Sequence, residues 1–150
     1  MASLTQLLIK AIKKEYDDNL TQFVGCSGLY YDHANSVKYP LITFKLHQAR
    51  RTATMEHYSD YDDVLIRFKV YANENNYATA LNLALEVEDL YHFVQLDLDD
   101  DDKYNLCLVK IDERHLFDTV LKVFIIELDF RAVVGDTVNS SSTSSSSSSY

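Results

Sequence analysis

The acidic residues between positions 97 and 102 are the first group in this sequence that could do chemistry. Five of these six residues are aspartates, and carboxylate oxygens are ligands that Ca²⁺ prefers. An EF-hand loop that begins at Asp97 would need a glycine in sixth place and a glutamate in twelfth, where Asp102 and Leu108 stand. The spacing therefore argues against an EF-hand, and we interpret Asp97–Asp102 as a solvated acidic loop.

A possible nucleophile site lies at Gly25–Gly28, whose sequence Gly-Cys-Ser-Gly contains a thiol and a hydroxyl. A nucleophile elbow would need a glycine in fifth place, where Leu29 stands. The four residues also match the spelling of the KH-type GxxG loop, but that loop clamps a phosphate backbone and this segment has no basic neighbours. We interpret Gly25–Gly28 as a tight turn.

The histidines and cysteines form no recognisable ligand or catalytic pattern. The five histidines lack HxH or HExxH spacing, and two cysteines are too few for a structural zinc site or a disulfide framework. Cys107 lies in an apolar segment, where a cysteine behaves as a small hydrophobe. The sequence leaves open a Cys–His pair that only the fold would assemble. We predict no enzymatic activity, no catalytic residue, no metal and no cofactor.

The charge balance bears on the possible partners. The chain of 150 residues has 14 lysines and arginines against 23 aspartates and glutamates, a net charge of -9. Such a chain is repelled on average by DNA and by anionic membranes, which disfavours a protein that reads DNA grooves. The first sixteen residues contain four charges at helical spacing, which is not typical of a signal peptide. No run approaches the roughly 18 apolar residues of a membrane span, so we predict no membrane partner.

The hydrophobic periodicity predicts an α+β fold. Ser3 and Gln6 form a capping-box pattern, and apolar residues at spacings of three and four predict helices over 4–17 and 77–93. Alternation with a period of two predicts strands, over residues 29–31, 42–47, 64–71, 104–111 and 117–131. We expect a mostly antiparallel sheet of about five strands with the two helices packed on one face.

Two segments between these strands are predicted to be loops. Gln48–Tyr61 is polar and shows no periodicity, so we expect a long hairpin loop there. Asp112–His115 is expected to be the turn between the last two strands. The chain has eleven tyrosines, a residue that suits both sheets and protein interfaces. The candidate contact residues in the long hairpin loop are Arg50, Arg51, Tyr58 and Tyr61.

The composition changes sharply near the end of the chain. Nine of the eleven residues from Asn139 to Ser149 are serines, and nothing in that stretch can be buried in a core. We expect a single domain over residues 1–134, followed by a flexible serine-rich tail over residues 135–150.

The order of these elements resembles the tail terminators (tail-completion proteins) of long-tailed bacteriophages, of the small α/β type. The segments that carry the resemblance follow the first helix or form strands: Gly28–Tyr31, Tyr39–Phe44, Asp62–Tyr71 and Val123–Arg131. The resemblance covers about Ser3 to Val134, and its motifs are apolar patterns rather than chemical signatures. The acidic loop and the serine tail depart from the family pattern.

The resemblance implies a structural virion protein that is made in the host cytoplasm and has no catalytic role. Such proteins form a ring, expected to contain six copies, that stops polymerisation of the tail tube and joins the tail to the head connector. The implied partners are further copies of the chain, the tail tube protein and the connector protein. DNA would pass through the lumen without sequence-specific binding, and an acidic bore would let it slide without sticking.

Three alternatives from other classes remain open at this point. One is a different neck component, such as a head-completion or connector protein. Another is a small cytosolic adaptor that binds a peptide along a sheet edge and is a monomer or dimer. The third is an enzyme whose cysteine, histidine and acidic groups meet only in the folded chain, which predicts a concave pocket with perturbed titratable residues.

Overall fold

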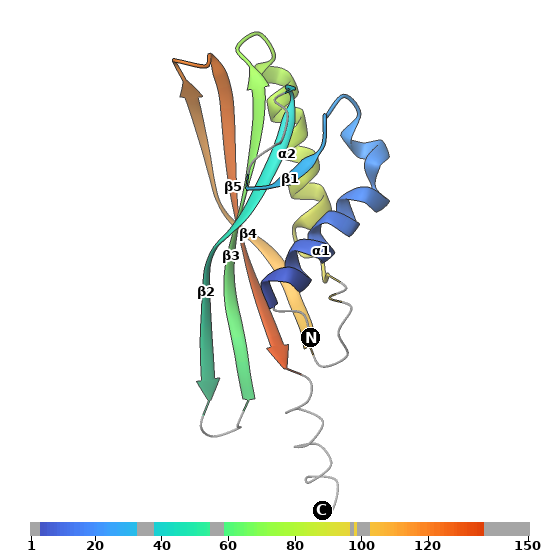
Figure 1. The fold of residues 1–150 in the computed structure, drawn as a ribbon, viewed down its shortest axis with the longest axis vertical. Coiled ribbons are helices and arrows are strands. Elements are labelled where there is room, and N and C mark those ends of the chain that lie inside the picture. The colour runs from blue at the N-terminus through green and yellow to red at the C-terminus, as the bar shows by residue number, and fades with distance from the viewer. Residues whose placement is uncertain (1–3, 33–37, 55–58, 97, 99–102, 137–150) are drawn as a thin grey trace, which may run out of the picture.

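The computed structural model describes residues 4–32, 38–54, 59–96, 98 and 103–136 (Figure 1). Within these residues the elements follow in chain order: α1 (Leu4–Asp18), η1 (Leu20–Phe23), β1 (Leu29–Tyr31), β2 (Leu41–Thr54), β3 (Ser59–Asn73), α2 (Tyr77–Tyr91), β4 (Lys103–Asp118) and β5 (Val123–Asp136). The strands form one sheet in the order β1-β2-β3-β5-β4. Strand β1 is parallel to β2, and the other neighbouring pairs are antiparallel. This arrangement confirms the predicted α+β fold.

The core lies between the helices and one face of the sheet, and Figure 1 shows both helices on the same side. Phe68 of β3 is fully buried at its centre, with its ring 4.9 Å from that of Tyr91, 5.4 Å from that of Phe130 and 5.8 Å from that of Phe44. The hydroxyl of Tyr91 donates to the carbonyl of Ile12 at 2.7 Å, which ties α2 to α1. Hydrophobic burial and this hydrogen bond therefore fix the helices against the sheet.

The prediction of a long hairpin loop over residues 48–61 is wrong. Strand β2 continues to Thr54 and β3 begins at Ser59, and the two strands pair up to the Thr54–Ser59 position. Ladder hydrogen bonds need only the backbone, so a strand with polar side chains on both faces shows no alternation in its sequence. The connection between these strands, residues 55–58, lies outside the described residues.

The predicted turn at Asp112–His115 is also wrong, because these residues pair with β5 inside the ladder. The chain turns at residues 119–122 instead. There the carboxylate of Asp118 accepts hydrogen bonds from the backbone N–H groups of Val120 at 2.9 Å and Leu121 at 3.0 Å. An aspartate that bonds the backbone two and three residues ahead stabilises a turn, and here it outweighs the apolar character of Val120 and Leu121.

Strand β5 extends two residues past Val134, the expected end of the domain. Gly135 pairs with Tyr61 of β3 and with Tyr104 of β4, and Asp136 pairs with Lys103. The first two residues assigned to the serine-rich tail therefore belong to the sheet. The rest of that segment, residues 137–150, lies outside the described residues.

Candidate interaction surface

The sheet face opposite the helices carries side chains of opposite charge on neighbouring strands. The two-residue period of a strand places Arg67 and Lys69 of β3 on this face, directly beside Asp129 and Glu127 of β5. Arg114 of β4 lies on the far side of the two acids. The acids are 6% and 7% exposed. Buried carboxylates need such partners, because desolvation without compensation is costly.

The geometry of this network is specific. The guanidinium of Arg67 donates to both carboxylate oxygens of Asp129, with Nε–Oδ1 at 2.7 Å and Nη2–Oδ2 at 3.2 Å. Arg114 Nη2 lies 2.9 Å from Glu127 Oε1, and Lys69 Nζ lies 3.6 Å from Glu127 Oε2. The hydrogen bond to Asp129 raises the pKa of Arg67 above its ordinary value. Each acid is thus paired with a basic side chain of a neighbouring strand, and these ion pairs stabilise the sheet.

A small pocket of about 110 Å³ opens on the same face beside Arg67. Its lining is mostly polar and consists of Asp32, Thr43, Phe44, Lys45, His47, Arg67 and Lys69. Desolvation lowers the pKa of His47, and the nearby charges of Arg67, Lys45 and Lys69 lower it further. The neutral imidazole is therefore the favoured form in this positive environment.

This shift predicts the sign of a pH effect on stability. The pKa of His47 is below its ordinary 6.5 in the folded chain, so the unfolded chain binds the proton first as the pH falls. The contribution of His47 to stability is thus present above about pH 6.5 and is lost at lower pH, despite the opposing attraction of Asp129. We expect His47→Gln to show a shallower loss of stability than the wild type between pH 7 and pH 5 in urea titrations. Parallel curves over that interval would contradict the assignment.

The predicted contact residues lie at the end of the sheet where β2 and β3 join. Arg50 and Arg51 are in β2 rather than in a loop, and their backbones pair with Asp63 and Asp62 of β3. Tyr61 is in β3, opposite Thr52 of β2 and Gly135 of β5. Tyr58 lies outside the described residues. The structure therefore brings Arg50, Arg51 and Tyr61 to one end of the sheet, with acidic residues at the opposing backbone positions.

A series of polar contacts between α2 and β4 has the hydroxyl, imidazole and carboxylate order of a catalytic triad. Tyr77 Oη lies 3.0 Å from His115 Nδ1, and His115 Nε2 lies 2.6 Å from Glu113 Oε2. The other oxygen of Glu113 contacts Lys110, which also binds Glu88. Hydrogen bonds from Lys110 and His115 lower the pKa of Glu113. None of these side chains lines the small pocket beside Arg67 or the groove between α2 and the η1 segment. Their open position lacks the enclosure on which electrostatic catalysis depends.

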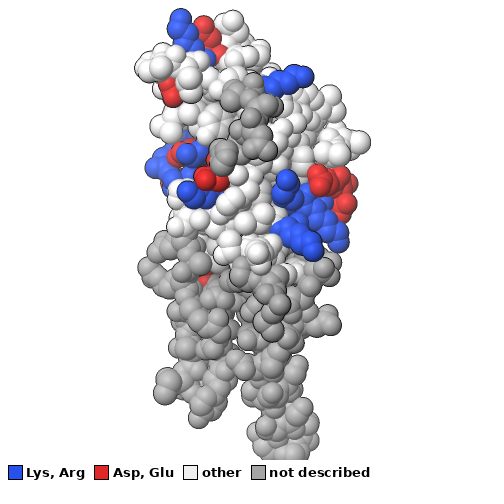
Figure 2. All heavy atoms as spheres, viewed as in Figure 1, with Lys and Arg blue, Asp and Glu red and all other residues white. Residues whose placement is uncertain are grey.

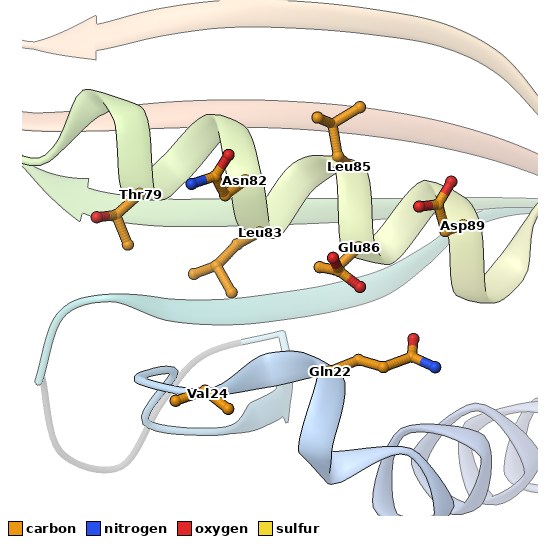
Figure 3. A pocket seen from close by; sticks show the side chains of 8 residues that line it. All are labelled: Gln22, Val24, Thr79, Asn82, Leu83, Leu85, Glu86 and Asp89. Atoms are coloured by element: carbon orange, nitrogen blue, oxygen red, sulfur yellow. The ribbon is translucent and has the colours of Figure 1, made fainter.

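A groove of about 510 Å³ runs between α2 and the segment that contains η1 (Figure 3). Leu83 is buried at its base, whereas Val24 and Leu85 are 83% and 57% exposed. Figure 3 shows Gln22 and Val24 on one side of the groove and the α2 side chains on the other. Those α2 side chains are Thr79, Asn82, Leu83, Leu85, Glu86 and Asp89. The groove is thus partly apolar and carries two acids.

The turn between β4 and β5 forms a second exposed apolar feature, which we call the hairpin tip (residues 118–122). Val120 is 87% exposed and Leu121 is 64% exposed. Besides the Asp118 contacts, the tip is held by a 3.1 Å hydrogen bond from the N–H of Glu74 to the carbonyl of Lys122. Apolar residues held in a fixed turn on the surface are typical of interaction sites.

The open edges of the sheet add backbone groups that another chain could pair with. Strand β1 pairs with residues 42–44 of β2, so among the described strands residues 45–54 have a neighbour on one side alone. On the opposite edge, Leu108 of β4 exchanges hydrogen bonds with Phe93 and Val94. The part of β4 beyond that contact pairs with β5 on its inner side. Such edges are templates for association between chains.

The charged side chains gather in mixed clusters separated by uncharged surface on the face that Figure 2 shows.

Among the described residues, no group of three or more His, Cys, Asp or Glu side chains could hold a metal ion. No helix in the described part of the chain is both long and apolar enough to cross a membrane. Cys26 packs against the core, and burial raises the pKa of its thiol.

These features define the chain as a one-sheet α+β protein whose notable surfaces are edges, a hairpin tip and an open groove. No protein-family model matches the sequence, and no curated protein matches it. Its fold is similar to that of a chain in the virion of a native gene transfer agent particle, with a TM-score of 0.66 and 18% sequence identity. The similarity covers 90% of this chain and 99% of that chain. At this identity the likeness establishes a shared fold.

Proposed function

We propose that this chain is a structural, non-enzymatic virion protein that forms a ring at the end of a phage-type tail tube. The observation that supports this most strongly is the fold shared with a gene transfer agent virion chain over nearly the full length of both. A domain that matches in extent as well as in topology supports a role of the same general kind, in a particle built from many chains.

The surface of the molecule supports the same proposal. A ring that closes on itself needs two different patches on each subunit that fit one another. The hairpin tip and the groove beside α2 are two such patches, and both include exposed apolar side chains. The sheet edges could extend the contact.

The proposed partners follow from the position of such a ring. They are the other copies in a ring of six, the tail tube protein on one side of the ring and the head–tail connector on the other. The net charge of -9 on each copy would repel DNA in the lumen and prevent it from sticking. We propose Arg50, Arg51, Tyr58 and Tyr61 as contacts to a neighbouring subunit or to the tube, at the end of the sheet where β2 and β3 join.

Removal of the protein from a producing cell tests the role. Without a terminator, we expect tail tubes of uncontrolled length that are not joined to DNA-filled heads, seen by electron microscopy of the lysate. Tails of normal length beside heads that have lost their DNA would instead indicate a head-completion or connector protein. Normal infectious particles would contradict any neck function and favour a cytosolic adaptor.

A further inference from the structure

The hairpin tip is built as an apolar anchor. Turns are usually formed by polar residues and glycine, but two of the exposed positions here are the apolar residues Val120 and Leu121. The Asp118 carboxylate fixes their backbone, and the Glu74–Lys122 hydrogen bond joins the turn to the end of β3. A rigid apolar pair loses little conformational entropy when it is buried by a partner.

The groove beside α2 has the complementary chemistry. Its base is Leu83, its apolar walls include Val24 and Leu85, and its polar rim includes the acids Glu86 and Asp89. The residue that follows the apolar pair of the tip is Lys122, whose side chain is exposed. Apolar side chains would thus meet an apolar base while the lysine meets two acids.

The position of the two features shows that they cannot serve each other within one subunit. In Figure 1 the hairpin tip lies at the left edge of the molecule, whereas η1 and α2, which bound the groove, lie to its right in the same half. None of the tip residues lines the groove. A contact between tip and groove must therefore join two copies, and it leaves one copy with an unused groove and the other with an unused tip.

We propose that the hairpin tip of one copy inserts Val120 and Leu121 into the groove of the next copy, with Lys122 beside Glu86 and Asp89. This inference rests on the proposed ring function and names the contact that closes the ring. The contact is head-to-tail, and its repetition closes a ring when the rotation between neighbouring copies closes and builds an open filament when it does not. The proposed ring function requires the first case.

Disulfide trapping in particles tests the contact directly. In a chain with Cys26→Ala and Cys107→Ala, the pair Val120→Cys and Leu85→Cys should give a ladder of linked chains up to the full ring on mild oxidation. The matched control combines Val120→Cys with Asp17→Cys, an exposed position on α1 outside the groove, and should give no ladder. A ladder from both pairs, or from neither while the ring is present in the particle, would overturn the contact and leave the ring function intact. Absence of the chain from particles would overturn the ring function itself.

Charge placed at the tip gives a second readout. The combined variant Val120→Asp and Leu121→Asp should keep its melting temperature, because both side chains are exposed, and should lower the yield of joined particles at least about tenfold, the factor that corresponds to 1.4 kcal/mol. Ile111→Thr, on the same hairpin but away from the tip, is the control and should keep the yield. A normal yield from the tip variant would contradict the proposal.

Discussion

Replacement of Phe68 by alanine should lower the free energy of unfolding by about 3–5 kcal/mol, the largest single effect we expect in this chain. Phe68 is fully excluded from solvent, and its ring packs against those of Phe44, Tyr91 and Phe130. The substitution removes these contacts and leaves a cavity where the sheet meets α2. Urea denaturation monitored by circular dichroism measures the loss.

Phe93→Ala is the matched control, because Phe93 is the same residue type but is largely exposed. We expect it to change the free energy of unfolding by less than about 1 kcal/mol. Similar losses from both variants would show that Phe68 is not at the centre of the core. An intact core matters for the proposed ring, because the sheet must hold the hairpin tip and the groove at a fixed separation.

Replacement of Asp129 by alanine should have the second largest effect, a loss of about 3 kcal/mol. The carboxylate is almost fully buried and accepts two hydrogen bonds from Arg67, so its removal leaves a largely buried guanidinium without its main partner. Breaking a buried ion pair from one side typically costs 3–5 kcal/mol, and the partial exposure of Arg67 places this case at the lower end.

The pair formed by Asp63 and Arg131 provides the control for this prediction. Its geometry is also bidentate, with Nε–Oδ1 at 2.9 Å and Nη2–Oδ2 at 2.7 Å, but the arginine is exposed. Exposed pairs contribute about 0–1 kcal/mol, so Asp63→Ala should cost less than about 1 kcal/mol in the same urea titration. Equal losses from the two aspartate variants would show that burial does not govern the network.

The sequence was sufficient to predict the parts of the fold in which burial has a period. Val64, Ile66 and Phe68 alternate with Leu65 and Arg67, and the expected strand is present with the first three side chains in the core. Both predicted helices are present as well, with bounds that agree to within two residues. These elements are recognisable because one face of each is buried and the other is not.

The sequence was not sufficient where backbone pairing or distant contacts decide the structure. Gln48–Tyr61 has no apolar alternation, so its incorporation into β2 and β3 depends on a register set elsewhere in the sheet. Arg67 and Asp129 are 62 residues apart, and only the β3–β5 pairing makes them neighbours. The apolar side chains of Val120 and Leu121 fit the pattern of the last predicted strand, and only the structure shows these residues at an exposed turn.

The sequence was also not sufficient to predict the groove of the proposed contact surface. The groove beside α2 forms because η1, a short helix that the sequence pattern does not predict, packs next to α2. The predicted contact residues Arg50 and Arg51 have known backbone positions in β2. Their role in docking stays a prediction, and reversal of both charges should block tail joining while the subunit remains folded.

Cryo-electron microscopy of the neck of a phage-type particle tests most directly whether this chain forms one closed ring there, as we propose. We predict a single six-fold layer between the tail tube and the connector, into which the sheet and both helices described here fit. A twelve-fold ring of this chain in the connector, or a neck in which the chain is absent, would contradict the account.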